Sequence, residues 1–387
     1  MTTYGTASLS EYSLLTEKTQ ESGDGTTNLS LTVSGSVVEN TQRVIDLYRS
    51  GAKLWTKSDL ERIEHELANF KTTPTFNVRR IDGTMDSVKN SMFGVENLLW
   101  KPFITFQHYW YMVGTSYART SSIRSAIPQS FPYYSYYITW ENQAFIEFVA
   151  GEDTTLEAKF EDARKKWESS QTCNWLKRKL AILQGGRKVT KLICFGLGTM
   201  EPRSQLDSRG SSSKYERDRF KYQRSSMNQH ALALTIAETL GKDVPVLAQD
   251  PTYTMESRDV LKNNGITTVR DHGAGRSAMV DDESAVLFCY PSCLVRQLMA
   301  DLARPALIVG NEGGTVMNDD QDVLFPYDAA FPRTREMFEG YTEHNFETME
   351  PDKMREGIVD FRIWVRNDVN GASTQVMAWL GEKGESE

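Results

Sequence analysis

From about residue 190 to 315, short apolar runs alternate with segments of helical length, and this alternation constrains the fold more than any other feature of the chain. The runs predicted as strands are KLICFGLG, VPVLAQDP, ITTVRD, SAVLFCYP and PALIVGNE, and the segments predicted as helices are SSMNQHALALTIAETLG, RDVLKNNG and SCLVRQLMADLA. Short apolar strands joined by helices form parallel sheets with right-handed crossovers. We therefore expect a doubly wound, Rossmann-like α/β domain over residues 190–387. Its tail would hold one more strand, DFRIWV, and a short helix, TQVMAWLG.

The part before this domain is predicted to be helical and rich in aromatic residues. Residues 1–34, rich in Ser, Thr and Gly without a sustained period, are expected to be a flexible arm. Residues 35–189 are expected to pack on the core as an extension. Its predicted helices are VVENTQRVIDLYRSG, LERIEHELANF with Thr56 or Ser58 as its cap, and two more near 154–167 and 173–183. Aromatic residues crowd residues 102–149, where they serve either core packing, which we favour, or a planar ligand.

Composition excludes several classes of protein. The chain has 387 residues, 39% of them hydrophobic and 25% charged, with a net charge of -8, which are ordinary globular values. Neither a signal sequence nor an uninterrupted apolar span is visible, so a cytoplasmic protein without a membrane partner is expected. Four cysteines are too few for a disulfide scaffold. No P-loop, zinc motif or Ser-His-Asp spacing is visible, so neither metal nor cofactor is predicted.

The loops at the carboxyl ends of the predicted strands are where an open parallel sheet binds ligands. The third glycine of the dinucleotide fingerprint is replaced by Glu201, so the turn at Gly196 and Gly198 serves either another ligand or the fold alone. His230 is interpreted as a packed helix residue. The residues predicted to bind substrate in these loops and the adjoining helix are Gly196, Gly198, Thr199, Gln229, Tyr253, Tyr290, Cys293 and Asn311.

Three further residues are candidates for the chemistry itself. Asp250 follows a strand and is either a substrate carboxylate or a helix cap. Ser292 and Cys293 stand at the start of a predicted helix, which favours an anion or a thiolate, although simple capping by Ser292 is the favoured alternative. Asn311 and Glu312 offer an amide and a carboxylate to a polar or cationic substrate, or else form a turn.

Charge is distributed unevenly along the chain. Residues 164–224 contain sixteen Lys and Arg against five Asp and Glu, a net of +11, which leaves -19 for the remainder. Such a segment either follows a phosphate backbone or is a solvated helix face with a disordered loop. On the first alternative we expect a basic face beside the crevice. The candidate RNA-binding residues are Arg164, Lys165, Lys166, Lys177, Arg178, Lys179, Arg187 and Lys188.

The ordered series KLICFGLGTM, QHALALTIAETLG, VLAQDPTYT, VLFCYPSC and ALIVGN resembles the family named for reduced sensitivity to red light, over residues 190–312. The family commonly has a His between the Pro and Cys of the fourth loop, where this chain has Ser292, and the basic insertion after Met200 is longer than usual. The helical preface LYRSGAKLWTKSDLERIEHEL is similar to that of the fungal members known as arginine-containing cyclodipeptide synthases.

This second resemblance implies an enzyme that joins aminoacyl groups from two charged tRNAs, one of them arginyl, into a diketopiperazine. It implies that the basic segment holds the RNA, and that Asp250 and Glu312 pair with the guanidinium. Ser292 would accept an acyl group, unless one aminoacyl amine attacks the other ester directly. The ester supplies the activation, so no cofactor is implied, and RNA rather than DNA is the partner. The alternative is a non-enzymatic regulatory protein of the same family that binds a small ligand or a protein. The second amino acid and the oligomeric state stay open.

Overall fold

The structure is a computed structural model. It describes residues 35–96, 99–107, 109–112, 134–142, 155–201, 212–250, 252–269, 272–291, 293–311, 331–349 and 357–367. Among these residues, no helix has both the length and the apolar character needed to cross a bilayer.

A seven-stranded sheet forms the centre of the C-terminal part, in the order β10-β11-β9-β8-β5-β6-β7. Its strands are β5 (Lys191–Phe195), β6 (Val246–Gln249), β7 (Ile266–Thr268), β8 (Ser284–Phe288), β9 (Leu307–Asn311), β10 (Tyr341–Asn345) and β11 (Phe361–Arg366). Strands β5 to β9 pair in parallel, whereas β10 and β11 join antiparallel at one edge. The predicted doubly wound, mostly parallel α/β fold is therefore confirmed.

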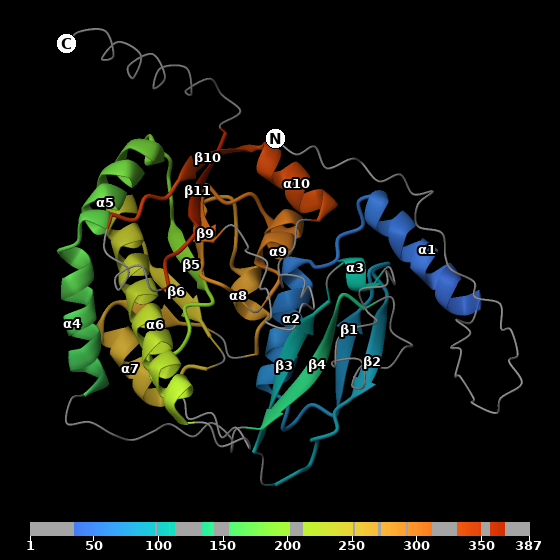
Figure 1. The fold of residues 1–387 in the computed structure, drawn as a ribbon. Coiled ribbons are helices and arrows are strands. Elements are labelled where there is room, and N and C mark those ends of the chain that lie inside the picture. Colours follow the sequence, from blue (N-terminus) through green and yellow to red (C-terminus); the bar gives the residue numbers. More distant parts are fainter. Residues whose placement is uncertain are drawn as a thin grey trace, which may run out of the picture.

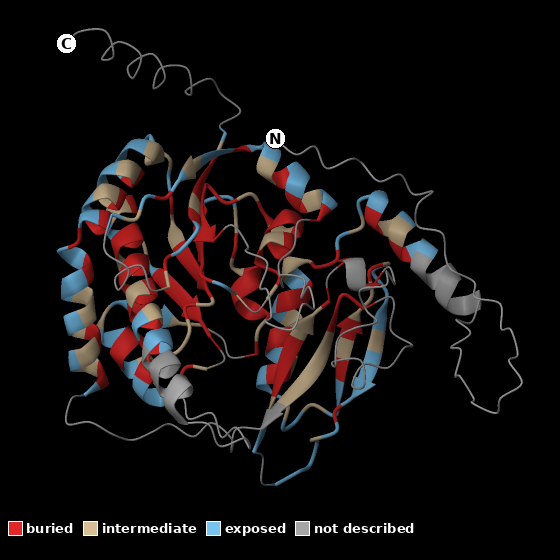
Figure 2. Ribbon diagram, viewed as in Figure 1, coloured by how far each residue is buried: buried red, intermediate tan, exposed pale blue. Residues whose placement is uncertain are grey.

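Helices cover both faces of this sheet (Figure 1). One layer holds α4 (Leu156–Glu168), α5 (Gln171–Gln184), α6 (Ser212–Leu240) and α7 (Met255–Asn263). On the other side lie α8 (Gly275–Ala278), α9 (Val295–Leu302) and α10 (Pro332–Glu339). Because successive side chains of a strand point to opposite faces, Leu192 and Cys194 pack with the first layer, and Ile193 and Phe195 with the second. Both faces are buried (Figure 2), which explains why these strands read as continuous apolar runs.

The N-terminal part packs against the second layer of helices (Figure 1). It contains α1 (Gly35–Arg49), α2 (Lys57–Ala68), α3 (Tyr109–Met112), and two antiparallel pairs, β1 (Thr75–Arg79) with β2 (Met85–Lys89) and β3 (Trp100–Phe106) with β4 (Tyr136–Asn142). One apolar cluster joins this part to the α/β domain, since Leu60 and Ile63 of α2 share it with Ala278, Leu294 and Leu298. Several of the crowded aromatic residues, such as Tyr109 and Tyr136, lie in the same cluster, as the packing interpretation predicted.

Several element boundaries differ from the sequence-based expectation. The helix after the polar insertion was expected to begin with SSMNQHALAL, but α6 begins earlier, at Ser212. The helix therefore includes the last part of the insertion and of the basic segment. Helix α9 begins at Val295 with Leu294 as its cap residue, and the predicted capping by Ser292 lies outside the described residues. Thr56 caps α2 through its hydroxyl, as predicted. The predicted arm 1–34 and the helix TQVMAWLG lie outside the described residues.

A buried carboxylate of the N-terminal part fixes the start of α8. The oxygens of Glu64, on α2, accept hydrogen bonds from the backbone N–H groups of His272, Ala274 and Gly275, at 3.1, 3.0 and 2.9 Å. The side chain of Glu64 is 2% exposed. Charge-assisted hydrogen bonds of this kind are stronger than neutral ones. The extension is therefore tied directly to the loop that leads from β7 into α8.

We predict that Glu64→Gln lowers the free energy of unfolding by about 2–3 kcal/mol, because a neutral amide cannot accept all three N–H bonds as well as a carboxylate. Urea denaturation of the full chain measures this change. Glu61→Gln is the matched control, since Glu61 is exposed on the same helix, and its effect should stay within about 0.5 kcal/mol. Equal stability of the two variants would contradict the role of Glu64.

Candidate functional site

The point where the strand order reverses lies between β5 and β8. The chain passes from β5 to β6 and β7 on one side, and then returns to β8 on the other side of β5. The carboxyl ends of two such strands form the crevice in which doubly wound folds bind ligands. Gly196 brings the two loops together: its φ is +67°, and a Cβ there would lie 2.7 Å from the Cys289 carbonyl oxygen and 2.8 Å from the Pro291 Cα. The glycine turn is thus required for this close approach.

Asp250 directly follows β6, and both of its carboxylate oxygens accept hydrogen bonds from other groups of the protein. Its Oδ2 accepts a hydrogen bond from the Gly198 N–H at 3.1 Å, and its Oδ1 accepts from the backbone N–H and the hydroxyl of Thr252, at 3.0 and 2.5 Å. The residue is 9% exposed. It joins the loops after β5 and β6, and its predicted place at the strand end agrees with the structure. Its role as a substrate carboxylate stays a prediction.

Glu201 is a second buried carboxylate at this edge, 8% exposed. Its Oε1 accepts hydrogen bonds from the hydroxyls of Thr254 and Ser257, at the start of α7, whereas its Oε2 has no partner among the described residues. Burial raises the pKa of Glu201 above its usual range, and the neighbouring charge of Glu256 adds to this, while the two hydroxyl bonds oppose it. A carboxyl group in this state gains most from a cationic partner.

His230 and Tyr253 form a buried pair below these loops. The Tyr253 hydroxyl lies 2.8 Å from His230 Nε2, and His230 Nδ1 lies 2.7 Å from the Ser226 carbonyl oxygen. Since a carbonyl only accepts, Nδ1 carries the proton and the tyrosine donates to Nε2. Burial lowers the pKa of His230 to about 4, so the imidazole is neutral at pH 7. The interpretation of His230 as a packed helix residue agrees with this geometry, and Tyr253 is held by it rather than exposed.

A buried guanidinium crosses the carboxyl ends of β5 and β6. Arg276, on α8, donates from Nη1 to the carbonyls of Cys194, at 2.9 Å, and Gln249. Its guanidinium stacks on the Phe195 ring, 3.8 Å from the ring centroid, and its Nη2 lies 3.9 Å from the Cys293 Sγ. The side chain is 6% exposed, and no described residue forms a hydrogen bond with its Nε. Burial lowers the pKa of Arg276, which the thiol of Cys293 opposes most among the neighbouring groups.

The other predicted loop residues have structural contacts. Asn311 Oδ1 accepts from the Tyr290 N–H at 3.0 Å, which holds Tyr290 at a φ of 47°, and the Tyr290 hydroxyl donates to the Val359 carbonyl. Gln229 donates to the Gly357 carbonyl, and Thr199 Oγ1 accepts from the Glu201 N–H. Ser292 and Glu312 lie outside the described residues. Within the described ranges, no three His, Cys, Asp or Glu side chains converge as a metal site.

The basic residues of α4 and α5 lie in the outer helical layer, and ion pairs accompany most of them. Lys165 and Lys166 pair with Glu161 and Asp162, at 3.1 and 2.6 Å, yet they stay 70% and 68% exposed. Two more basic residues of the set line a surface recess of about 390 Å³ with their acidic partners: the pairs are Arg164 with Glu168 and Lys177 with Glu238, beside Leu234 and Thr235. Arg178 is exposed and Lys179 half-buried.

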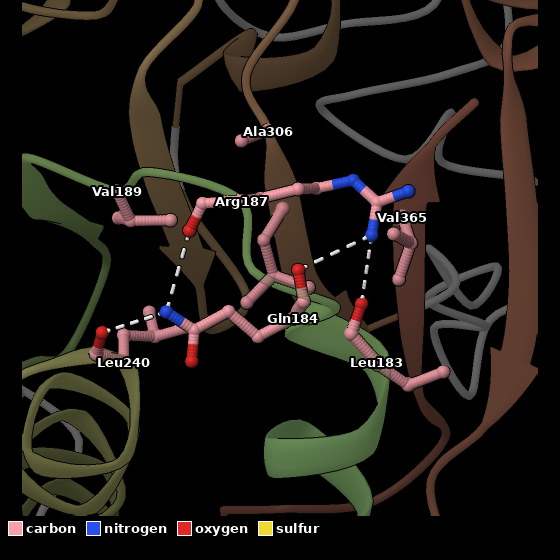
Figure 3. A pocket seen from close by; sticks show the side chains of 8 residues that line it. Leu183, Gln184, Arg187, Val189, Leu240, Ala306 and Val365 are labelled. Atoms are coloured by element: carbon pink, nitrogen blue, oxygen red, sulfur yellow. Dashed lines mark hydrogen bonds between the residues drawn. The ribbon is translucent and has the colours of Figure 1, made fainter. Parts of the chain in front are cut away.

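Arg187 and Lys188 lie at the amino ends of the strands, opposite the carboxyl ends where the crevice is expected. The expectation that they lie beside the crevice is therefore wrong. Arg187 donates to the carbonyls of Leu183 and Gln184 at the end of α5, next to a cavity of about 10 Å³ that Leu240 and Val365 also line (Figure 3). Lys188 pairs with Glu283, just before β8. Both residues precede the amino ends of strands, because the connection from α5 into β5 is short.

The family of the chain follows from a comparison with protein-family models. Residues 154–352, just over half of the chain, match the model of the SRR1 domain. The chain belongs to the SRR1 domain family. The matched region contains α4 and α5 as well as strands β5 to β10 of the sheet, whereas we assigned both helices to the extension, and it ends before β11. No curated protein matches the chain.

Sequence reasoning missed two charged residues of this SRR1 domain site. Glu201 was noted only as the residue that breaks the dinucleotide fingerprint, although a carboxylate three residues after a G-x-G turn was a usable signal. Arg276 stands in a short segment, GAGRSAM, whose pattern predicted no element. Its guanidinium reaches the site from α8, across two strands, and linear spacing does not reveal such a contact.

We predict that Gly196→Ala lowers the free energy of unfolding by about 2–4 kcal/mol, since the new Cβ meets backbone atoms of the β8 loop and φ is positive. Gly186→Ala is the control: its φ is +78° but nothing lies within 4 Å of the new Cβ, so it should cost only about 1 kcal/mol. Equal losses in urea denaturation would show that the two loops separate easily.

We predict a pH dependence of stability from His230. Its pKa of about 4 in the folded chain lies below the value near 6.5 of an unfolded histidine, so the unfolded chain binds more protons between these values. The stabilisation is therefore complete above pH 6.5 and declines as the pH falls. Between pH 7.5 and 5 the wild type should lose about 2 kcal/mol more than His230→Asn. Tyr253→Phe keeps the histidine and should keep the slope; identical slopes for wild type and His230→Asn would refute the assignment.

Proposed function

We propose that this SRR1 domain protein is a tRNA-dependent cyclodipeptide synthase that joins an arginyl group from arginyl-tRNA with a second aminoacyl group to give cyclo(Arg-Xaa). The proposal starts from the resemblance of the helical preface, which forms the end of α1 and most of α2. Through Glu64 this preface is bound to the start of α8, which carries Arg276 into the candidate site. The segment that carries the resemblance is thus in direct contact with the SRR1 domain.

The observation that carries the proposal is the unpartnered Oε2 of Glu201. An arginyl substrate presents a guanidinium, and a buried carboxylate is its natural partner in a site of low dielectric constant. The hydroxyls of Thr254 and Ser257 occupy only Oε1. The oxygens of Asp250, by contrast, already accept bonds from Gly198 and Thr252, so Glu201 is better suited than Asp250 to bind the guanidinium.

The outer face of α4 and α5 is the proposed contact for the RNA. Lys165, Lys166 and Arg178 are exposed, and ion pairs between exposed side chains are worth at most about 1 kcal/mol, so a phosphate can replace the acidic partners. Ser292 as acyl acceptor and Glu312 as a further carboxylate stay predictions. The reaction proposed here draws its energy from the aminoacyl ester and needs no added cofactor.

Expression of the chain in a bacterial host, followed by mass analysis for cyclo(Arg-Xaa), tests the proposal. A cell-free reaction with purified chain should lose its product when ribonuclease is added before the substrate. No product, or a product insensitive to ribonuclease, refutes the synthase and favours the regulatory alternative.

We predict that Glu201→Gln lowers the yield of cyclo(Arg-Xaa) by about tenfold to a hundredfold, because the loss of a buried charged hydrogen bond costs roughly 1.5–3 kcal/mol. Glu256→Gln is the matched control: Glu256 is exposed in the first turn of α7, and the same change of charge should alter the yield less than twofold. Circular dichroism verifies that both variants fold. An unchanged yield from folded Glu201→Gln would show that another group binds the guanidinium.

A further inference from the structure

One of the four cysteines differs from the others in its surroundings. Cys173, Cys194 and Cys289 are buried, at 0%, 0% and 1% exposure, and burial raises the pKa of each thiol. Cys293 is half-buried and lies in the loop that follows β8, at the point where the strand order reverses. It is therefore the one cysteine that combines access from solvent with a place at the switch point of the sheet.

The guanidinium of Arg276 faces this thiol. Its Nη1 is used by two backbone carbonyls, its plane lies on Phe195, and its Nη2 lies 3.9 Å from the Cys293 Sγ. Among the described residues no carboxylate forms an ion pair with Arg276, although Asp250 contributes at longer range. A cation held in this way stabilises a thiolate relative to a thiol.

Several buried polar atoms on β6, α8 and α9 have no hydrogen-bond partner among the described residues. Besides the Nε of Arg276, they include the Oε1 of Gln249, the Oγ of Ser277 and both amide atoms of Gln297. These residues lie at the end of β6, on α8 and on α9, which contact one another. Buried polar atoms normally have partners, and five that lack one within the described part of the chain indicate that polar groups of a ligand belong here.

We propose that Cys293 is the nucleophile that accepts an acyl group in the crevice, and that Arg276 is the positioning residue that holds its thiolate. The identity of the acyl donor, an aminoacyl ester, rests on the proposed function. Cys293 then takes the role that the sequence suggested for its neighbour Ser292. The half-buried thiol comes from the loop after β8 and the buried guanidinium from α8.

The step balances without an added reagent. The Cys293 thiol loses its proton to solvent, and Sγ forms a bond to the ester carbonyl carbon. The bond between that carbon and the ribose oxygen breaks, and the released oxygen takes a proton from water. The product is a thioester, from which the amine of the second aminoacyl group displaces the thiolate: a C–N bond forms, the C–S bond breaks, and the amine proton passes to solvent.

Other titratable and charged groups around this pair enter its pH dependence. Asp250, Tyr253 and Cys194 act on the guanidinium of Arg276, and Arg296 lies three residues after Cys293 on α9. Arg296 donates to the Asn311 carbonyl at 2.5 Å and adds positive charge to the same loops. The guanidinium of Arg276, 3.9 Å from the Cys293 Sγ, therefore favours the anionic form of the thiol.

The first experiment measures the thiol itself, independently of the proposed function. The full chain is treated with iodoacetamide at pH 7, native and in 8 M urea, and each cysteine is followed by peptide mass analysis. Cys293 should react about tenfold faster in the native chain than in urea, because the neighbouring guanidinium increases the fraction of reactive thiolate. The three buried cysteines should react more slowly in the native chain. Native Cys293 slower than denatured Cys293 overturns the proposal.

Two variants test the part played by Arg276. Arg276→Met removes the charge but also leaves the carbonyls of Cys194 and Gln249 without a donor. Arg276→Lys is therefore measured beside it, because it keeps the charge and loses only the two-pronged guanidinium group. In Arg276→Met the alkylation of Cys293 should slow about fivefold to tenfold and its midpoint should move to higher pH, whereas Arg276→Lys, which keeps the charge but not the Nη2 beside the thiol, should shift both in the same direction by less. An unchanged midpoint in a folded variant removes Arg276 from the proposal.

The second experiment links the thiol to acyl transfer. The full chain is mixed with arginyl-tRNA labelled in the amino acid, quenched in acid, and treated with neutral hydroxylamine, which cleaves a thioester but spares a serine ester. The label should be lost with hydroxylamine, and Cys293→Ala should abolish both label and product, while Cys289→Ala retains both. Product from wild type that persists in Cys293→Ala overturns this inference and leaves the synthase standing. Absence of product from the wild type overturns both the proposed synthase activity and the acyl transfer to Cys293. The alkylation rates still test whether the Cys293 thiol is activated.

Discussion

The buried guanidinium of Arg276 is the interaction on which the candidate site depends. It draws together the carbonyls at the ends of β5 and β6, rests on Phe195 and faces Cys293 across the switch point. A buried charge is costly unless its surroundings supply hydrogen bonds, and the carbonyl dipoles at the strand ends do so here. Its place is set in turn by α8, whose first N–H groups are held by Glu64 of the N-terminal part. The extension is thus a structural requirement of the site, since the arginine would lack a fixed backbone without it.

Ionisable groups at this edge have distinct states because their surroundings differ. Asp250 is satisfied by backbone N–H and hydroxyl donors, Glu201 only on one oxygen, and His230 is neutral through burial. The neutral histidine makes Tyr253 a donor and keeps a second positive charge away from Arg276. Among the described residues, the arrangement therefore leaves one carboxylate oxygen and one guanidinium–thiol pair to which a ligand can bind, both at the carboxyl ends of the strands. A cationic side chain and an activated carbonyl are the two groups that an arginyl ester presents.

The fold was largely readable from the sequence, whereas the site was readable only in part. Short apolar strands between helices determined the sheet, because burial on both faces requires uninterrupted apolar runs, and Leu192 and Ile193 point to opposite layers as this implies. The strand-end rule also led to Asp250 and Cys293. It missed Arg276 because α8 contains four residues and lacks a periodic pattern. The small N-terminal sheets were missed because β2 is almost fully exposed, so its residues show no alternation.

The charge of the chain illustrates why composition along a sequence differs from charge on a surface. The segment 164–224 carries a net charge of +11, but Glu161 and Asp162, just before it, pair with Lys165 and Lys166 one helical turn later. Arg187 donates hydrogen bonds to backbone carbonyls at the end of α5, near the amino ends of the strands and away from the crevice. What is left for a polyanion is the outer face of α4 and α5, in the layer that packs on α6. Since α6 itself begins in the basic insertion and leads from the glycine turn, a nucleic acid on this layer would approach the crevice along α6, with its ester end toward the strand termini.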